Sequence, residues 1–425
     1  MRKKKTALSP LSSVTGLFLL SALAVLCACV SILGIKLSNA PVLPWQQLIP
    51  IGVYFVGMPL ILLWLKMIGW KGDAGLLGAV FLLCGMGLVI QFRMGSFAQG
   101  LEQPLALLPF PLGLAAFLLG VTATGKGRGR WLAGTGWMAY LAAAGVLAAM
   151  LLLGRRFRGG IYMPGHMNPS EIIKPLLVIF LAAYLSRRQK DFSETQIGIP
   201  VPALDSLLAL IFLWGVPMLF IVLLKDLGMM MLLNATLIIM LFAISQGTGY
   251  LALGLTAVTA AGFGMRMLSS NVRNRFDVWL NPFADPTGKG WQTLQALCAM
   301  YSGGAWGTGL GAGVPQTVPI VTSDFIYAAL AEELGLVGCA LLLMVYAILF
   351  SRGFRAAGAT RTPFERLLCV GLTGSLAVQT LINVAGVTKA LPMTGITLPF
   401  ISHGGSSLIT SMLIAGLLAG LSDRK

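Results

Sequence analysis

Residues 265–335 read MRMLSSNVRNRFDVWLNPFADPTGKGWQTLQALCAMYSGGAWGTGLGAGVPQTVPIVTSDFIYAALAEELG and form the longest run of the chain that cannot lie in a bilayer. The run opens with basic side chains, continues through glycine-rich turns, and reaches Asp324 where an apolar helix begins. Its tryptophans (Trp279, Trp291 and Trp306) indicate a packed segment rather than a solvated linker. Long ordered loops in compact proteins usually carry function. We therefore expect a functional loop with apolar helices arranged around it.

The composition of the rest of the chain is that of a membrane protein. Of 425 residues, 57% are hydrophobic and only 10% are charged, whereas soluble domains carry about 25% charged residues. Because a span needs about 20 apolar residues, the sequence predicts an all-α, polytopic integral membrane protein with about twelve transmembrane helices. The predicted spans lie near residues 13–35, 46–66, 74–92, 104–122, 131–153, 169–187, 203–224, 227–245, 248–268, 325–350, 364–388 and 403–421. We interpret the first as an uncleaved anchor, since more spans follow it.

The basic residues predict the orientation. The formal charge is +16, from 30 Lys+Arg against 14 Asp+Glu, and basic loops mark the cytoplasmic side of a membrane protein. An even number of spans puts both termini on one side, and the basic N-terminus makes that side cytoplasmic. The basic residues form no long surface run, so nucleic acid is not a predicted partner. The six cysteines show no metal-ligand spacing and imply no disulfide framework.

Two groups of basic residues fall outside in this topology. They are Arg155, Arg156 and Arg158, and the cluster Arg266, Arg273, Arg275 and Lys289. An anionic substrate is one reason to keep them there, because a guanidinium matches the geometry of a phosphate. Contact with anionic lipid of the outer leaflet is the alternative.

The start of the predicted helix near 169–187 carries an unusual pair of charges. Asn168 as N-cap, Pro169 at the first helical position and Glu171 at the third would form a capping-box-like start. Lys174 lies one turn further into an apolar helix, and three-residue spacing puts it on the face of Glu171. Ionisable residues inside a membrane are costly and indicate function. We expect the two side chains to pair.

Other polar positions allow a purely structural interpretation. Asp226 is most simply the N-cap of the helix that follows it, and Asp324 could cap its own helix. Eight residues along a helix advance roughly 80° and nine roughly 180°. We therefore expect Glu332 near the face of Asp324 and Glu333 on the opposite face.

Two glycine-containing segments have features of anion-binding sites. Small residues at 402–407 permit close helix packing, but amides and hydroxyls at a helix N-terminus also suit an anion. The glycines of 307–311 lack the strand context of a nucleotide-binding loop, so nucleotide binding is not predicted.

Five ordered motifs over about residues 75–425 resemble the SEDS family of RodA/FtsW/SpoVE-type peptidoglycan polymerases. The matching segments are Pro169-Ser170-Glu171-x-x-Lys174; Asp226-Leu227-Gly228, with Lys225 in place of proline; Asn281-Pro282-x-x-Asp285-Pro286-x-Gly288-x-Gly290-Trp291-Gln292-x-x-Gln295; Ser323-Asp324-Phe325-Ile326 with Glu332-Glu333-Leu334-Gly335; and Thr394-Gly395-Ile396-x-Leu398-Pro399-Phe400 with Ser402-His403-Gly404-Gly405-Ser406-Ser407. The chain departs from the family pattern at Pro319-Ile320-Val321, at His403 in place of tyrosine, and at Lys389, where a small residue is common.

The resemblance implies a glycosyltransferase that polymerises lipid II into glycan strands on the outer face of the bacterial cytoplasmic membrane, for elongation, division or sporulation. It implies a ten-helix core, here 73–425 with an extracytoplasmic loop at 269–324, preceded by an extra helical pair at 1–72. Asp324 would be the catalytic carboxylate. Candidate substrate-binding residues are Glu171, Lys174, Arg273, Arg275, Arg156, Gln295, His403 and Ser406.

The implied partners are lipid II, the growing glycan strand, a class B penicillin-binding transpeptidase, cell-division or elongation membrane proteins, and membrane lipids. No residue is assigned as a metal ligand, and a divalent cation (Mg²⁺ or Mn²⁺) is the candidate cofactor. Two other functions stay open from the residues. The chain could be a flippase or transporter of a lipid-linked precursor, or a catalytically weak scaffold for a transpeptidase.

Overall fold

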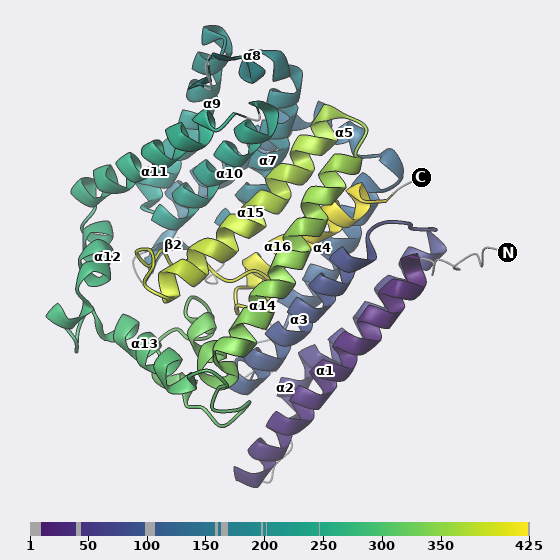
Figure 1. Ribbon diagram of the computed structural model, residues 1–425, viewed down its shortest axis with the longest axis vertical. Coiled ribbons are helices and arrows are strands. Elements are labelled where there is room, and N and C mark those ends of the chain that lie inside the picture. The colour runs from purple at the N-terminus through teal and green to yellow at the C-terminus, as the bar shows by residue number, and fades with distance from the viewer. Residues whose placement is uncertain are drawn as a thin grey trace.

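Helices make up nearly all of the regular structure (Figure 1), as predicted. The computed structural model describes residues 10–39, 44–97, 107–157, 160–162, 169–196, 199–200, 202–245 and 247–423. Its helices are α1 (Pro10–Asn39), α2 (Trp45–Met67), α3 (Ala74–Met94), α4 (Pro109–Thr124), α5 (Arg130–Gly134), α6 (Gly136–Leu153), α7 (Ser170–Arg187), α8 (Gln189–Ser193), α9 (Leu204–Leu224), α10 (Leu227–Ser245), α11 (Gly249–Leu268), α12 (Ser270–Leu280), α13 (Trp291–Gly303), α14 (Ile326–Ala359), α15 (Pro363–Val387) and α16 (Gly405–Leu421). Short 3₁₀ turns occur at Gly125–Gly127, Pro282–Ala284 and Pro315–Thr317.

Two short antiparallel strand pairs complete the described structure. They are β1 (Arg155–Phe157) with β2 (Gly160–Tyr162), and β3 (Thr195–Gln196) with β4 (Ile199–Pro200). The first pair lies between α6 and α7, and the second lies between α8 and α9.

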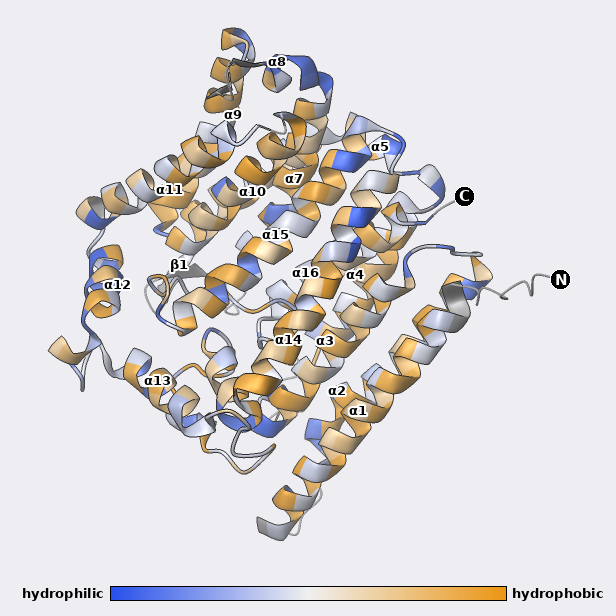
Figure 2. Ribbon diagram, in the orientation of Figure 1, coloured by the Kyte–Doolittle hydropathy of each residue, from blue (hydrophilic) through white to orange (hydrophobic). Residues whose placement is uncertain are grey.

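The long helices have the length and composition of membrane spans. Nine of those in the described ranges qualify, or ten when α11 and α12, which meet at a bend of 111°, count as one span. Figure 2 shows apolar helix bodies with polar positions gathered toward the ends of the bundle. The polytopic membrane class is thus confirmed. The count of twelve stays a prediction, because α7 carries three charged residues and α16 has only 17 residues.

Element boundaries differ from the predicted ones in several places. The predicted helix at 131–153 is two helices, α5 and α6, which meet at Thr135 between two glycines that weaken the helix. The predicted loop at 269–324 contains α12 and α13, and the helix expected at 325–350 continues to Ala359. The predicted start of the fourth span, 104–106, lies outside the described residues.

Helices α3, α15 and α16 form the buried centre of the bundle. α16 packs most closely against α4, where a Cβ added at Gly416 would lie 2.2 Å from the carbonyl oxygen of Phe117. Only glycine permits this approach, and close backbone contact is how membrane helices gain packing energy. The centre therefore supplies a rigid support for the segments that precede α14 and α16.

The N-terminal pair α1 and α2 packs at one edge of this bundle, with α1 along α3 (Figure 1). Lys36 near the end of α1 donates hydrogen bonds to Gln47 Oε1 at 2.6 Å and to the carbonyl of Phe92 at 2.8 Å. At the other end, the indole of Trp70 donates to the carbonyl of Ala419 at 3.0 Å. Both ends of the pair are thus tied to the remaining helices. The division at residues 72 and 73 stays a prediction.

Helix α14 is broken at Gly335, whose φ is +68°. The glycine-rich segment after α13 fills the break, because the amides of Leu336 and Val337 donate to the carbonyls of Gly304 and Ala305 at 3.0 and 3.1 Å. A Cβ at Gly335 would lie 2.3 Å from the amide nitrogen of Gly307. The position therefore accepts only glycine.

Candidate active site

Asp324 lies in the turn before α14. Phe325, not Asp324, occupies the N-cap position of that helix, and no side chain makes a capping hydrogen bond there. The structural interpretation of Asp324 as a helix cap is therefore wrong. Its backbone is held from α15 instead, because Asn383 Nδ2 donates to the Asp324 carbonyl at 3.0 Å and to the Ile396 carbonyl at 2.7 Å.

The two residues before Asp324 are held by the segment that leads into α16. The Thr322 carbonyl accepts hydrogen bonds from Gln91 Nε2 at 3.0 Å and from the His403 amide at 2.8 Å. Ser402 Oγ donates to the Ser323 carbonyl at 2.6 Å. Three elements far apart in sequence thus fix the turn that presents Asp324.

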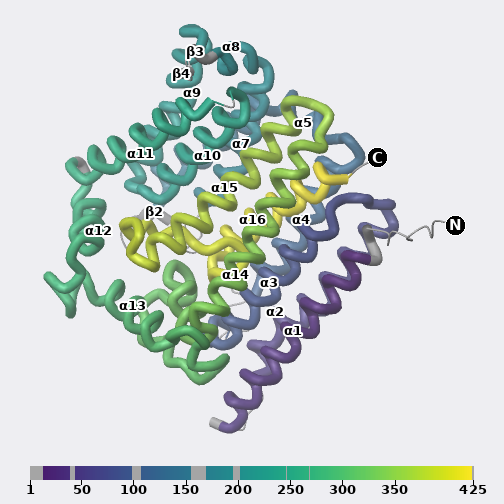
Figure 3. Tube along the Cα trace, in the orientation of Figure 1, coloured from purple at the N-terminus to yellow at the C-terminus, as the bar shows by residue number. Residues whose placement is uncertain are grey.

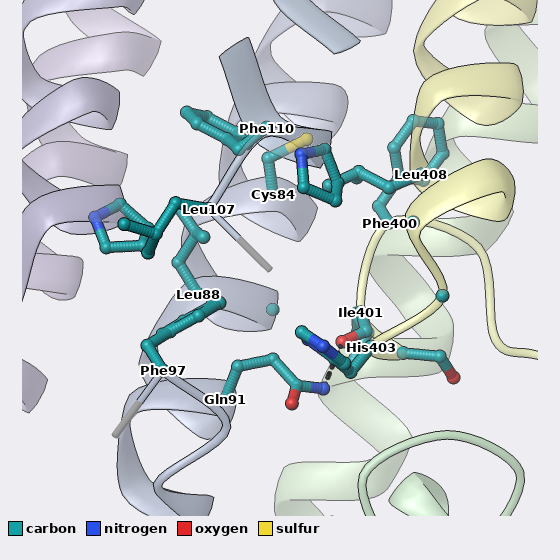
Figure 4. A pocket seen from close by; sticks show the side chains of 16 residues that line it. Cys84, Leu88, Gln91, Phe97, Leu107, Phe110, Phe400, Ile401, His403 and Leu408 are labelled. Carbon is teal, nitrogen blue, oxygen red and sulfur yellow. Dashed lines mark hydrogen bonds between the residues drawn. The ribbon is translucent and has the colours of Figure 1, made fainter. Parts of the chain in front are cut away.

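His403 does not line the Asp324 cavity; it lines a small apolar cavity between α3, α4 and the segment before α16 (Figure 4). Gln91 and Phe97 line the same cavity, and the centres of the Phe97 and His403 rings are 5.7 Å apart. Burial lowers the pKa of the His403 imidazole. In this structure His403 holds the turn through its backbone.

The Asp324 side chain faces a cavity of about 520 Å³. Figure 3 shows the end of α15 and the segment after it turned toward α12 and α13, and this cavity lies between them. Its charged lining residues are Asp324, Arg275, Lys289 and Lys389. A Cβ added at Gly395 would lie 3.5 Å from Asp324 Oδ2 and 3.7 Å from Arg275 Nη1. One carboxylate therefore shares a cavity with three cations.

The environment of Asp324 changes its acidity. Burial raises the pKa of its carboxyl to about 6, while the Ser323 side chain and the positive charge of Arg275 act in the opposite direction. A carboxylate with this pKa is ionised at neutral pH, and it is a stronger base than an exposed aspartate, whose pKa is about 3.9. The arrangement suits a group that accepts a proton near neutral pH.

Arg273 and Arg275, both predicted to bind substrate, differ in their position relative to the cavity. Arg275 Nη1 donates to the carbonyls of Met393, at 3.1 Å, and Thr394, and its guanidinium lines the cavity. Arg273, which is exposed like Arg275, donates to the Met267 carbonyl at 3.5 Å and does not line the cavity. Two residues on a helix are about 200° apart, so α12 turns these side chains in opposite directions.

Glu171 and Lys174 pair as expected, but both lie outside the cavity. The Lys174 ammonium is 1% exposed and donates to the Glu171 carboxylate and to Gln379 Oε1 at 2.6 Å. Gln379 Nε2 in turn donates to the Thr397 carbonyl at 3.0 Å. This buried network connects α7 and α15 with the segment that contains Gly395. Direct contact of either residue with substrate stays a prediction.

Two of the remaining candidates do not line the Asp324 cavity. Gln295 on α13 and Ser406 in the first turn of α16 are half-buried and do not line the cavity. Arg156 lies in β1, and its side chain, like Asn168, lies outside what the structure describes. The predicted cap at Asp226 is confirmed, since its carboxylate accepts from the Met229 amide at 2.9 Å.

Glu332 and Glu333 both bind the glycine-rich segment, and Glu333 also pairs with the neighbouring helix α3. Glu332 Oε1 accepts from the Val314 amide at 2.8 Å, and Glu333 Oε2 accepts from the Gly311 amide at 3.1 Å. Arg93 Nε forms an ion pair with Glu333 Oε1 at 2.9 Å. The helix angles do not apply to Asp324, which precedes the first residue of the helix, Ile326, and Glu332 does not line the Asp324 cavity. Sequence reasoning also missed Arg93, whose only signal is a lone arginine at the end of an apolar helix.

The cavity is a poor site for a resident metal ion. Mg²⁺ and Mn²⁺ prefer several oxygen ligands, whereas this cavity offers one carboxylate beside three cations. Within the described ranges, no group of three or more acidic, histidine or cysteine side chains could hold a metal ion.

Comparison with known proteins agrees with this architecture. A profile of the family described as cell cycle protein, named for FtsW, RodA and SpoVE, matches residues 160–425. The chain belongs to this family. The resemblance drawn from the five motifs is thus confirmed.

Among its relatives, peptidoglycan glycosyltransferase RodA of Mycobacterium tuberculosis is 37% identical over 364 residues, which cover 82% of this chain and 78% of the relative. A solved chain from a peptidoglycan synthase complex that coordinates polymerization and crosslinking is 27% identical and has a TM-score of 0.63. The match covers 83% of this FtsW/RodA/SpoVE-family chain and 98% of the solved one. The crystal structure of RodA from Thermus thermophilus, at 24% identity and a TM-score of 0.57, shares the fold and covers 83% and 98% of the two chains.

Proposed function

We propose that this protein is a peptidoglycan glycosyltransferase that polymerises lipid II on the outer face of the bacterial cytoplasmic membrane. The observation that carries the proposal is Asp324, a carboxylate with its pKa raised to about 6 in a cavity with three cations. Relatives of the chain that are named peptidoglycan glycosyltransferases support the same activity. The raised pKa favours proton transfer, and the positive charge of Arg275 and Lys289 favours an anionic leaving group.

The chemistry assigns a role to each charged residue. Asp324 accepts the proton of the acceptor sugar hydroxyl as the hydroxyl oxygen bonds to the anomeric carbon of the donor sugar. The bond from that carbon to the phosphate oxygen breaks, and undecaprenyl pyrophosphate leaves with its charge balanced by Arg275 and Lys289. Asn383, Ser402 and the His403 amide act as positioning groups, because they hold the backbone of the turn at Asp324.

The proposal is tested by incubating the purified full-length protein with labelled lipid II, with and without a class B transpeptidase. We expect undecaprenyl-linked glycan strands. A chain that moves lipid II across a vesicle membrane but makes no polymer would instead be a flippase. A chain that makes no polymer either alone or with the transpeptidase, but binds the transpeptidase, would be a scaffold.

We further propose that a class B penicillin-binding transpeptidase is the partner. The solved chain from a complex that coordinates polymerization and crosslinking supports this assignment. Contacts with cell-division or elongation proteins, and with membrane lipids, rest on the family resemblance. Co-purification with a tagged transpeptidase tests whether that transpeptidase is the partner.

We propose twelve spans with both termini cytoplasmic, a ten-helix core at 73–425 and an added pair at 1–72. Single cysteines at the exposed positions Ser270 and Gly358, in a chain lacking its six natural cysteines, test this topology. Ser270→Cys in intact cells should react with a membrane-impermeant thiol reagent, and Gly358→Cys should react only after permeabilisation. The opposite labelling pattern would show that the protein has the inverse orientation in the membrane.

Arg275 should contribute more to activity than Arg273. Arg275→Gln removes a cation that lines the cavity, and a charge-assisted hydrogen bond is worth about 1.5–3 kcal/mol, or roughly 10- to 100-fold in rate. Arg273→Gln changes an exposed residue of the same helix and should leave turnover within about twofold. The activity of Arg275→Lys should lie between those of the wild type and Arg275→Gln, since lysine keeps the charge but loses the bidentate hydrogen-bonding geometry of the guanidinium. The rate is measured as glycan formed per minute. Equal losses of this rate at both positions would show that Arg275 has no special role in the site.

A further inference from the structure

Lys389 has a backbone conformation that normally belongs to glycine. It follows the C-terminus of α15 with φ of +61°, and its amide donates to the Gly386 carbonyl at 3.3 Å. Glycine is the usual residue at this point of a helix end, because a Cβ in the left-handed region is unfavourable. The indole of Trp279 on α12 donates to the Lys389 carbonyl at 3.1 Å. The chain therefore retains a costly residue and supports it from a second helix.

A second strained residue lines the same cavity. Ile320 has φ of +55°, which is rare for a β-branched side chain. Together, Ile320 and Lys389 are two of the five non-glycine residues with positive φ in the described ranges. Backbone strain of this kind concentrates at functional sites. Its position here indicates that the wall carrying Lys389 takes part in binding.

The ammonium of Lys389 differs from the other two cations of the cavity. Arg275 is tied to the carbonyls of Met393 and Thr394, and Lys289 Nζ donates to Asn274 Oδ1 at 3.0 Å. Among the side-chain hydrogen bonds and ion pairs of the described residues, none involves Lys389 Nζ. A half-buried cation in this state is available for an incoming anion.

We propose that Lys389 is a second anion subsite in this cavity, which binds an oxyanion of the substrate that is not released. This inference rests on the proposed function. Glycan polymerisation brings together two lipid-linked sugars, each with a pyrophosphate, and only one pyrophosphate leaves. Arg275 and Lys289 serve the leaving group, and Lys389 serves an oxyanion of the other substrate, either its retained pyrophosphate or a carboxylate of its peptide.

Lys389→Gly tests the subsite without damaging the fold. Glycine relieves the left-handed backbone, so the melting temperature should stay level or rise. The apparent KM for lipid II should rise about tenfold, which is the effect of losing about 1.4 kcal/mol of binding, while kcat stays within about twofold. A lysine that only stabilises the helix C-terminus through its charge would give the reverse: a lower melting temperature and an unchanged KM.

Lys126→Gly is the matched control. Lys126 is also left-handed, with φ of +57°, but it lies beside Gly420 and Leu421 at the C-terminal end of α16, whereas the Asp324 turn contacts the N-terminal end. Its replacement should bring the same backbone relief with no change in KM. An unchanged KM for Lys389→Gly, or an equal rise for Lys126→Gly, would overturn the proposal.

Two further measurements identify the anion and separate this inference from the proposed function. Lipid II with amidated peptide carboxylates should abolish the KM difference if Lys389 binds a carboxylate, and weaker inhibition of Lys389→Gly by inorganic pyrophosphate would indicate the phosphate. Direct binding of lipid II is measured in the Asp324→Asn background, which we expect to turn over far more slowly. A tenfold weaker Kd on adding Lys389→Gly supports the subsite even if the polymerisation assay fails, and an unchanged Kd rejects it.

Discussion

Asp324→Asn is expected to lower the rate of glycan synthesis by on the order of 10²–10⁴, the usual loss when a general base is removed. Asparagine has nearly the same volume but cannot accept a proton at neutral pH. The hydrogen bond from Asn383 reaches the backbone carbonyl of residue 324, so the turn should keep its position. Since Phe325 occupies the N-cap, the substitution also removes no helix cap. The measurement is lipid II polymerisation by membrane-inserted protein.

Asp277→Asn is the control for this change. Asp277 is an exposed aspartate of α12 that pairs with Arg266 at 3.1 Å, and exposed ion pairs contribute at most about 1 kcal/mol. Its replacement should leave synthesis near normal. If Asp324→Asn also made glycan at a near-normal rate, Asp324 would not be the base.

The acid limb of the pH profile gives an independent readout of the same carboxyl. With its pKa raised to about 6, Asp324 must lose its proton before it can act, so kcat should fall as the pH drops through about 6. Arg275 stabilises the charged carboxylate and therefore lowers this pKa. In Arg275→Gln the limb should move to higher pH, and the activity deficit should be larger at pH 6.5 than at pH 8. If the acid limb did not move, Arg275 would not influence the pKa of Asp324.

Arg93→Met is expected to destabilise the protein by about 3–5 kcal/mol, because it leaves the carboxylate of Glu333 buried without a counter-charge. The Glu333 side chain is fully buried, and Arg93 Nε lies 2.9 Å from its Oε1. Arg93 Nη2 also donates to the Gly313 carbonyl at 2.8 Å, so the glycine-rich segment loses a second anchor. Unfolding in detergent, followed by the loss of helical circular dichroism, measures the effect.

A double variant separates loss of charge balance from loss of packing. In Arg93→Met/Glu333→Gln the buried group is neutral and still accepts from the Gly311 amide, so much of the lost stability should return. Arg352→Met is the matched surface control. Its pair with Asp73, at 3.4 Å, is partly exposed and should cost less than about 1 kcal/mol. Equal losses for Arg93→Met and Arg352→Met would show that the buried pair contributes nothing special.

Local sequence patterns determined the features that depend on short distances along the chain. Apolar runs of about 20 residues predicted the long helices, because a bilayer requires that length. Three-residue spacing predicted the Glu171–Lys174 pair, and the position of Asp226 before an apolar run predicted its cap. Ordered motifs identified the family. Each of these follows from the geometry of one helix or one turn.

Tertiary structure alone decided which charges from distant parts of the sequence meet. Arg93 and Glu333 are 240 positions apart, and the cavity joins Asp324 to cations from α12, from the segment before α13 and from the end of α15. Arg273 and Arg275 carry the same charge in the sequence, but the formation of α12 within the predicted loop sends only Arg275 into the cavity. Helix period and apolar length set where each helix lies, whereas the facing of one helix toward another depends on packing between distant segments, for which a single sequence holds no local signal.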